Sequence, residues 1–150
     1  MMFAPQRILV PTDFSPHADK ALKMAVDLAV QYRAKVFLLH VIDQHIQQCA
    51  ADYCLTAELV TQIESDSLNQ AREKIEKEAA GIVDTKQVDI VFDVRNGNPA
   101  DEILQEQLAQ DIELIVIASH GRTGVKRFLI GSVTDKVVRG AACSVLVVKP

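Results

Sequence analysis

Residues 114–133, LIVIASHGRTGVKRFLIGSV, are the stretch around which the rest of the chain is organised. Its first five residues form an apolar run that is too short for a helix and rich in β-branched side chains, which predicts a buried strand. Ser132 is a residue type that often caps the start of a helix, and residues 133–139 continue with helical spacing. The stretch therefore predicts a strand, a loop and a helix start.

The loop between this strand and helix combines glycines with basic side chains. It holds three of the six glycines of the chain and three cations, namely Gly121, Gly124, Gly131, Arg122, Lys126 and Arg127. Glycine lets backbone N–H groups approach an anion closely, and the start of a helix offers unpaired N–H donors. The hydroxyl of Ser132 adds one donor. A polyphosphate fits this pattern, although glycine-rich loops also form ordinary turns, so both interpretations stay open.

The same stretch resembles the signature of a known family. Ala118-Ser119-His120-Gly121, nine residues and then Gly131-Ser132 are similar to Gly-x2-Gly-x9-Gly-(Ser/Thr), the ATP-binding signature of universal stress proteins. Ala118 stands where that signature has its first glycine. An L-residue fits there if its φ is negative, and its methyl group would then lie next to a ribose or a phosphate.

Size and composition indicate one globular domain over residues 1–150. The chain is 49% apolar and has a net charge of −4, which disfavours general binding to nucleic acids or to membrane surfaces. No apolar run reaches the roughly 18 residues of a membrane span, and residues 1–7 lack the apolar core of a signal peptide. We therefore expect a cytoplasmic protein.

The cysteines and histidines indicate neither a disulfide framework nor a metal site. Cys49, Cys54 and Cys143 are odd in number and have no C-x-x-C spacing, so reduced thiols are expected. His45 lies near the first two of them, but the spacing is irregular and no second ligand pair follows. We expect no metal bound by side chains there.

The remaining pattern alternates strands with helices. Strands are predicted at residues 7–11, 35–42, 88–94 and 144–148, and helices after Ser15-Pro16, over residues 57–80 with Gly81 as the stop, and after Asn98-Pro99. Ile103, Leu104 and Leu108 are predicted to form the apolar side of the helix after Pro99. This order predicts a doubly wound, Rossmann-like α/β fold, with a five-stranded parallel sheet in the order 3-2-1-4-5 and helices on both faces. The resemblance implies the related adenine nucleotide alpha hydrolase-like fold.

Ligands of such sheets lie outside the carboxyl ends of the strands. Asp13 follows the first strand, where its carboxylate could accept hydrogen bonds from a ligand or from nearby turn amides. The resemblance favours the ligand, because Pro11-Thr12-Asp13 and Val41 match family contacts to the nucleotide. It implies a site for ATP, AMP or ADP made of Pro11, Thr12, Asp13, Val41, Ala118, Ser119, His120, Gly121, Arg122, Gly124, Gly131, Ser132 and Val133. Any Mg²⁺ would be held mainly by the phosphates and water.

Three functions remain open at this point. The resemblance implies an ATP- or AMP-binding module for stress adaptation, in which occupancy changes conformation or partner choice and turnover is slow. A weak ATPase or nucleotidyl-transfer enzyme using His120 is the second hypothesis, although no base and nucleophile pair can be assigned from the spacing. The third is a nucleotide-free interaction protein whose pocket is closed by Ala118. The chain lacks Gly-x-Gly-x-x-Gly and the P-loop pattern, which disfavours dinucleotide enzymes and P-loop NTPases.

The last predicted strand bears on assembly. Val145, Leu146, Val147 and Val148 would form an apolar sheet edge, which is an aggregation hazard if left bare. Antiparallel pairing with a second copy removes the hazard, and the resemblance implies this homodimer.

Overall fold

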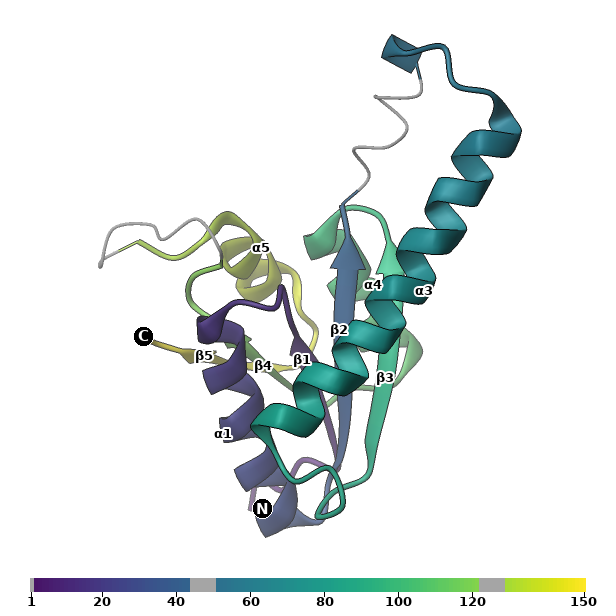
Figure 1. The fold of residues 1–150 in the computed structure, drawn as a ribbon. Coiled ribbons are helices and arrows are strands. Elements are labelled where there is room, and N and C mark those ends of the chain that lie inside the picture. The colour runs from purple at the N-terminus through teal and green to yellow at the C-terminus, as the bar shows by residue number, and fades with distance from the viewer. Residues whose placement is uncertain (1, 44–50, 122–128) are drawn as a thin grey trace.

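The computed structural model describes residues 2–43, 51–121 and 129–150. Five parallel strands form one sheet in the order β3-β2-β1-β4-β5, as predicted (Figure 1). The strands are β1 (Arg7–Pro11), β2 (Lys35–Ile42), β3 (Ile90–Asn96), β4 (Leu114–Ala118) and β5 (Ser144–Val148). The helices are α1 (Pro16–Tyr32), α3 (Ala57–Ile82), α4 (Pro99–Ala109) and α5 (Ser132–Gly140).

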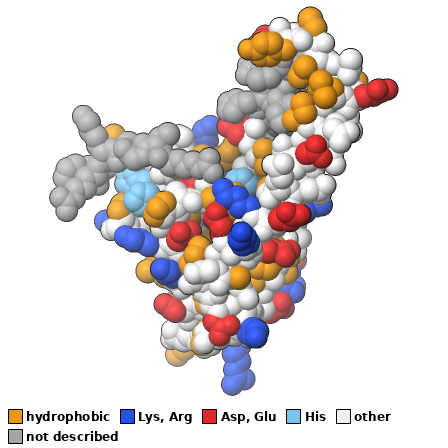
Figure 2. All heavy atoms as spheres, in the orientation of Figure 1, with side chains coloured by type: hydrophobic (Ala, Val, Ile, Leu, Met, Phe, Trp, Pro, Cys, Tyr) orange, Lys and Arg blue, Asp and Glu red, His pale blue; other side chains and the backbone are white. Residues whose placement is uncertain are grey.

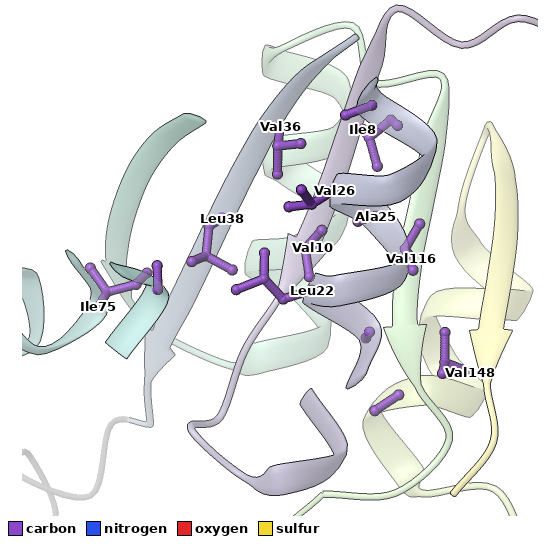
Figure 3. Packing of buried hydrophobic residues seen from close by; sticks show 14 of the residues in the cluster. Ile8, Val10, Leu22, Ala25, Val26, Val36, Leu38, Ile75, Val116 and Val148 are labelled. Carbon is purple, nitrogen blue, oxygen red and sulfur yellow. The ribbon is translucent and has the colours of Figure 1, made fainter. Parts of the chain in front are cut away.

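Each face of the sheet packs against its own pair of helices. On one face Ile8, Val10 and Val116 belong to one cluster with the apolar stripes of α1 and α3. Figure 3 shows Val10 beside Leu22 of α1, and Ile75 of α3 beside Leu38. On the other face α4 and α5 cover a second cluster. Alternate residues of a strand point to opposite faces, and both faces are covered, which explains why the strands read as continuous apolar runs.

Only the second half of α3 is buried against the sheet. Ala71, Ile75 and Ala79 of α3 are buried, while the first turns of α3 are largely exposed. Figure 1 shows this end of the helix projecting beyond the sheet. In Figure 2, acidic and basic side chains are intermixed over the face that α1 and α3 cover, which agrees with the small net charge.

Local capping explains most helix boundaries. The Ser15 hydroxyl accepts a hydrogen bond from the Ala18 amide at 3.2 Å, and Pro16 occupies the first turn, as predicted. Asn98 caps α4 in the same way. Before it, Gly97 has a φ of +151°, a conformation that L-residues rarely adopt, so the turn into α4 requires glycine.

Four local predictions are wrong. Gly81 does not end α3, because the helix continues to Ile82, which packs on the core. The third strand is Ile90–Asn96 instead of residues 88–94. Ser132 is the first residue of α5, and Gly131 is its N-cap. Leu108 is 64% exposed.

The exposure of Leu108 has a physical reason in its neighbours on α4. Gln107 and Glu106 take the inward positions because both find partners there. The Gln107 side-chain oxygen accepts a hydrogen bond from the Ala142 amide at 3.2 Å, and Glu106 accepts one from Arg95 at 3.1 Å. Buried polar groups are tolerated when they are paired in this way, and α4 is rotated so that Leu108 faces outward.

Candidate functional site

A cavity of about 650 Å³ opens at the carboxyl ends of β1, β2 and β4. This volume lies in the range of small-molecule sites in proteins. The lining residues are Pro11, Thr12, Asp13, Ala18, Leu39, Val41, Asp43, Pro99, Ile103, Ile117, Ala118, His120, Gly121, Leu129, Ile130, Gly131, Ser132, Val133 and Thr134. The place is the one expected for a ligand of a doubly wound sheet, at the point where the strand order reverses.

Two local hydrogen bonds and a ring contact shape the loop after β1. The Asp13 carboxylate accepts from the Ser15 amide at 3.0 Å, and the Thr12 hydroxyl accepts from the Phe14 amide at 3.1 Å. Phe14 adopts a left-handed φ of 64°, which is uncommon for a bulky residue. Its ring packs on His40 with centroids 4.3 Å apart. These contacts fix Asp13 at the cavity wall.

Asp13 also lies directly beside the loop that follows β4. A Cβ added to Gly121 would lie 2.7 Å from the Asp13 carboxylate oxygen. A side chain at position 121 would force the Asp13 carboxylate to shift, so this arrangement of the two segments favours glycine at position 121. The two predicted site regions, one after β1 and one after β4, therefore meet in space.

The start of α5 forms another part of the cavity wall, and it differs from the other helix starts. Side chains of Ser15, Thr56 and Asn98 cap α1, α3 and α4, whereas the described residues provide no side-chain cap for α5. The first amides of a helix have no acceptor within that helix. The N-terminus of α5, with its positive dipole end, therefore faces the cavity without a side-chain cap.

Two hydrogen bonds tie this helix start to the end of β4. The Gly131 amide donates to the Ser119 carbonyl at 2.8 Å, and the Thr134 hydroxyl donates to the Ala118 carbonyl at 2.7 Å. The loop thus leaves the sheet at residue 119 and returns to it at residue 131. This closure places Ser132 and Val133 at the cavity.

Ala118 lines the cavity without closing it. It is the last residue of β4 and has no positive φ, so an L-residue is accommodated there without backbone strain. The cavity is present with the alanine methyl group in its wall.

The next two residues turn away from solvent. The Ser119 amide donates to the Val148 carbonyl at 2.9 Å, and its side chain is buried beside the cavity without lining it. His120 is 6% exposed and lines the cavity, and its Nδ1 lies 2.8 Å from the Ser119 hydroxyl oxygen. The side chains of these two consecutive residues therefore contact each other.

Several predicted residues fall outside the part of the chain that the structure describes. Arg122 and Gly124, together with Lys126 and Arg127, lie outside the described residues, as do His45 and Cys49. In the described part of the lining there are two carboxylates, Asp13 and Asp43, and no lysine or arginine.

Some lining residues were not predicted as site residues. Pro99 and Ile103 belong to the start of α4, which the sequence indicated as a turn and an apolar stripe. Leu129 and Ile130 precede α5 and are half-exposed at the cavity. The alternation of strands and helices could have indicated that the start of α4 lies at the site. This start follows the carboxyl end of β3, and the carboxyl ends of all the parallel strands lie at the edge of the sheet where the cavity opens. Leu129 and Ile130 carried no such signal.

An ionic cluster lies behind the α4 wall of the site. Arg95 contacts Glu102 and Glu106, each at 3.1 Å, and Glu106 is 3% exposed. Burial raises the pKa of the Glu106 carboxyl, and the nearby Asp93 carboxylate raises it further, while Arg95 acts in the opposite direction. The cluster connects β3 to α4 and so helps to position the start of α4.

In the described part of the chain, no three His, Cys, Asp or Glu side chains are grouped so that they could hold a metal ion. None of the described helices combines the length and the apolar composition needed to cross a membrane.

Residues 5–149 match the universal stress protein family. Universal stress protein MJ0577 of Methanocaldococcus jannaschii is 33% identical, over 96% of this chain and 94% of its own length. Universal stress protein MJ0531 of the same organism is 31% identical, over 96% of this chain and 82% of its own length. A solved structure of MJ0577 superimposes with a TM-score of 0.80 at 30% identity, covering 99% of this chain and 98% of that chain.

Two more distant structures share the fold and were solved with adenine nucleotides. A universal stress protein in complex with cAMP has a TM-score of 0.64 at 22% identity, with 98% of both chains covered. The universal stress protein from Archaeoglobus fulgidus in complex with dAMP has a TM-score of 0.56 at 22% identity, also with 98% of both chains covered.

Proposed function

The chain belongs to the universal stress protein family, and we propose that it binds an adenine nucleotide, ATP, ADP or AMP, in the cavity at the carboxyl ends of β1, β2 and β4. The observation that carries this proposal is the start of α5, which lacks a side-chain cap and faces the cavity. Amides at a helix N-terminus together with its dipole favour an anion. The cAMP and dAMP complexes of the two more distant relatives support an adenine nucleotide as the anion's source.

The cavity offers different chemistry to the different parts of a nucleotide. Val41, Ile103 and Ile117 provide apolar walls for a base. The Asp13 carboxylate provides acceptors for ribose hydroxyls or an amino group, and the amides at Ser132 and Val133 provide donors for phosphate oxygens. An apolar wall with a few convergent polar groups is the usual composition of a cofactor site.

Any Mg²⁺ bound with the nucleotide would be held mainly by phosphate oxygens and water. The carboxylates of Asp13 and Asp43 line the same cavity, and oxygen ligands of this kind suit Mg²⁺. The negative charges of these two carboxylates and of the nearby phosphates together favour a bound cation.

We propose that the nucleotide acts as a signal, with occupancy changing the conformation or the partner choice of a cytoplasmic stress-adaptation protein. A catalyst of hydrolysis would need a base that orients the attacking water. His120 is the only histidine of the described lining; its Nδ1 lies against the Ser119 hydroxyl and its Nε2 is buried, so neither nitrogen is placed to take a proton from a water in the cavity. Turnover should therefore be slow.

Titration calorimetry with adenosine, AMP, ADP and ATP tests the binding proposal. AMP is expected to bind at least tenfold more tightly than adenosine, because only AMP places a phosphate at the start of α5. Equal affinities, or no binding of any of the four by well-folded protein, would contradict the proposal. Steady ATP hydrolysis that is lost in His120→Ala at unchanged nucleotide affinity would favour the enzyme hypothesis instead.

We also propose a homodimer formed through β5. This strand is an edge of the sheet, and Val145, Leu146 and Val147 are only partly buried. Antiparallel pairing with a second copy would satisfy the backbone groups of this edge. Sedimentation at micromolar concentration is expected to give the mass of a dimer, and a monomer there would refute this assembly.

A further inference from the structure

The residue that follows Asp13 has an unusual backbone conformation for its size. Phe14 has a φ of 64°, in the left-handed region, where a bulky side chain crowds the backbone and glycine does not. Residues in such strained conformations persist only where the surrounding structure holds them, and they are often found at functional sites. The described lining of the cavity includes Asp13 but not Phe14. Any effect of the Phe14 ring on a ligand must therefore pass through its neighbour.

Two side chains from different elements hold the Phe14 ring. The ring of His40, on β2, packs against it with centroids 4.3 Å apart and planes tilted by 39°. The Lys74 ammonium group, on α3, lies over the same ring, 4.3 Å from its centroid. At this distance a cation is attracted to the face of an aromatic ring. The ring thus joins the loop after β1 to β2 and to α3.

His40 also holds the backbone on the other side of Asp13. Its Nδ1 lies 2.8 Å from the Thr12 carbonyl oxygen. A carbonyl oxygen can only accept a hydrogen bond, so Nδ1 carries the proton and donates it. The Thr12 amide in turn donates to the Leu39 carbonyl at 2.8 Å. Thr12 is therefore fixed at both its N–H and its C=O group, and Asp13 lies between two residues that are held in place.

We propose that Phe14, held by His40 and Lys74, is a positioning residue that orients the Asp13 carboxylate toward the nucleoside part of the ligand. None of these three side chains belongs to the described lining of the cavity, so they act on the ligand through Asp13. The inference rests on the proposed nucleotide site, in which Asp13 contacts the ribose or the base while the start of α5 contacts the phosphate. Loss of the ring should therefore weaken binding of the nucleoside part alone.

Titration calorimetry of Phe14→Gly with adenosine and with AMP tests this consequence. Glycine adopts the left-handed conformation without strain, so the variant should keep the turn while losing the ring; circular dichroism checks its fold. Both affinities should fall about tenfold, the loss expected for one hydrogen bond to a charged group. The ratio of the two affinities should stay unchanged, because the contacts to the phosphate are unaffected. Phe14→Tyr keeps the ring and should bind both ligands as tightly as wild type.

A matched control removes another aromatic ring from the same core. Phe92 is partly buried against the cluster that Phe14 also contacts, and it does not belong to the described lining. Phe92→Ala should lower the free energy of unfolding and leave both affinities unchanged. Equal losses of affinity in Phe92→Ala and Phe14→Gly would show a general effect of destabilisation and would overturn the inference.

Amide hydrogen exchange of the ligand-free protein separates a failure of this inference from a failure of the proposed function. The Ser15 amide donates to the Asp13 carboxylate at 3.0 Å, so its protection reports whether that carboxylate is held. Phe14→Gly should lower this protection and leave that of the Leu59 amide, bonded to the Thr56 hydroxyl, unchanged. Unchanged Ser15 protection, or adenosine binding as tight as in wild type, would overturn the inference. If the wild-type protein binds neither ligand, the proposed function fails, and the exchange of the Ser15 amide still decides whether Phe14 positions Asp13.

Discussion

Replacing Ser132 with proline removes one backbone N–H at the start of α5 and should leave the helix itself in place. Proline is tolerated at the first position of a helix, where the missing N–H has no partner within the helix. Gly131 has φ −60° and ψ 153°, an extended conformation that suits the residue before a proline. The variant should therefore keep the fold while losing one donor and the serine hydroxyl at the cavity.

The expected loss follows from the strength of one hydrogen bond to a charged group. Such a bond contributes about 1.5–3 kcal/mol, which corresponds to a roughly 10- to 150-fold weaker affinity for AMP. Adenosine has no phosphate, so its affinity should be nearly unchanged. Titration calorimetry with both ligands measures the difference.

Two further variants isolate the amide. Ser132→Ala removes only the hydroxyl and should weaken AMP binding less than the proline variant does. Ala57→Pro places the same substitution at the first position of α3, after Thr56 with φ −70° and ψ 151°, and away from the cavity. It should leave the AMP affinity unchanged. A folded Ser132→Pro protein that binds AMP as tightly as wild type would refute the reasoning.

Three other perturbations test the site wall, the ionic cluster and the core. Gly121→Ala places a methyl group 2.7 Å from an Asp13 carboxylate oxygen and should weaken nucleotide binding about tenfold by titration calorimetry, since one polar contact is displaced; unchanged affinity would remove Asp13 from the site. Burial raises the pKa of Glu106, so ionisation of this carboxyl opposes folding. Glu106→Gln should therefore raise the free energy of unfolding at pH 7, as measured by urea titration. The gain should vanish as the pH falls below the ordinary glutamate pKa of about 4.3, because the carboxyl is then neutral in both the folded and the unfolded state. A gain that grows toward low pH would contradict the sign. Ile75→Ala, in the core, should lower the free energy of unfolding by about 2–5 kcal/mol. Leu108→Ala, on the surface, should change it by less than about 0.5 kcal/mol. Similar losses for both variants would show that α4 is rotated differently.

The sheet could be predicted from sequence because its signals are local and repeated. Apolar runs such as residues 114–118 are buried on both faces, and the caps at Ser15 and Asn98 mark helix starts by residue type alone. Alternation of these elements then fixes a parallel sheet, and the reversal of strand order places the cavity.

The errors arose where a tertiary contact overrides a local preference. Leu108 faces solvent because Gln107 and Glu106 have inward partners on other elements, which no helical periodicity reveals. Gly81 stays within α3 because the core contact of Ile82 extends the helix past it. Ser132 does not act as the N-cap of α5. The Gly131 amide donates to the Ser119 carbonyl, which places Gly131 at the N-cap position and Ser132 inside the helix.

The contact between the rings of His17 and His120, whose centroids are 6.2 Å apart, could not be predicted for a similar reason. The two residues are far apart in the sequence, and the packing of α1 against β4 brings their rings together. The approach of Asp13 to Gly121 is also a property of the assembled sheet, since these residues follow different strands.

A crystal structure of the protein grown with excess ATP tests the central claim most directly. We predict adenine against the apolar wall that includes Val41, and phosphate oxygens within hydrogen-bond distance of the amides at the start of α5. A well-ordered structure with the nucleotide bound elsewhere, or with this cavity empty at saturating ATP, would contradict the account.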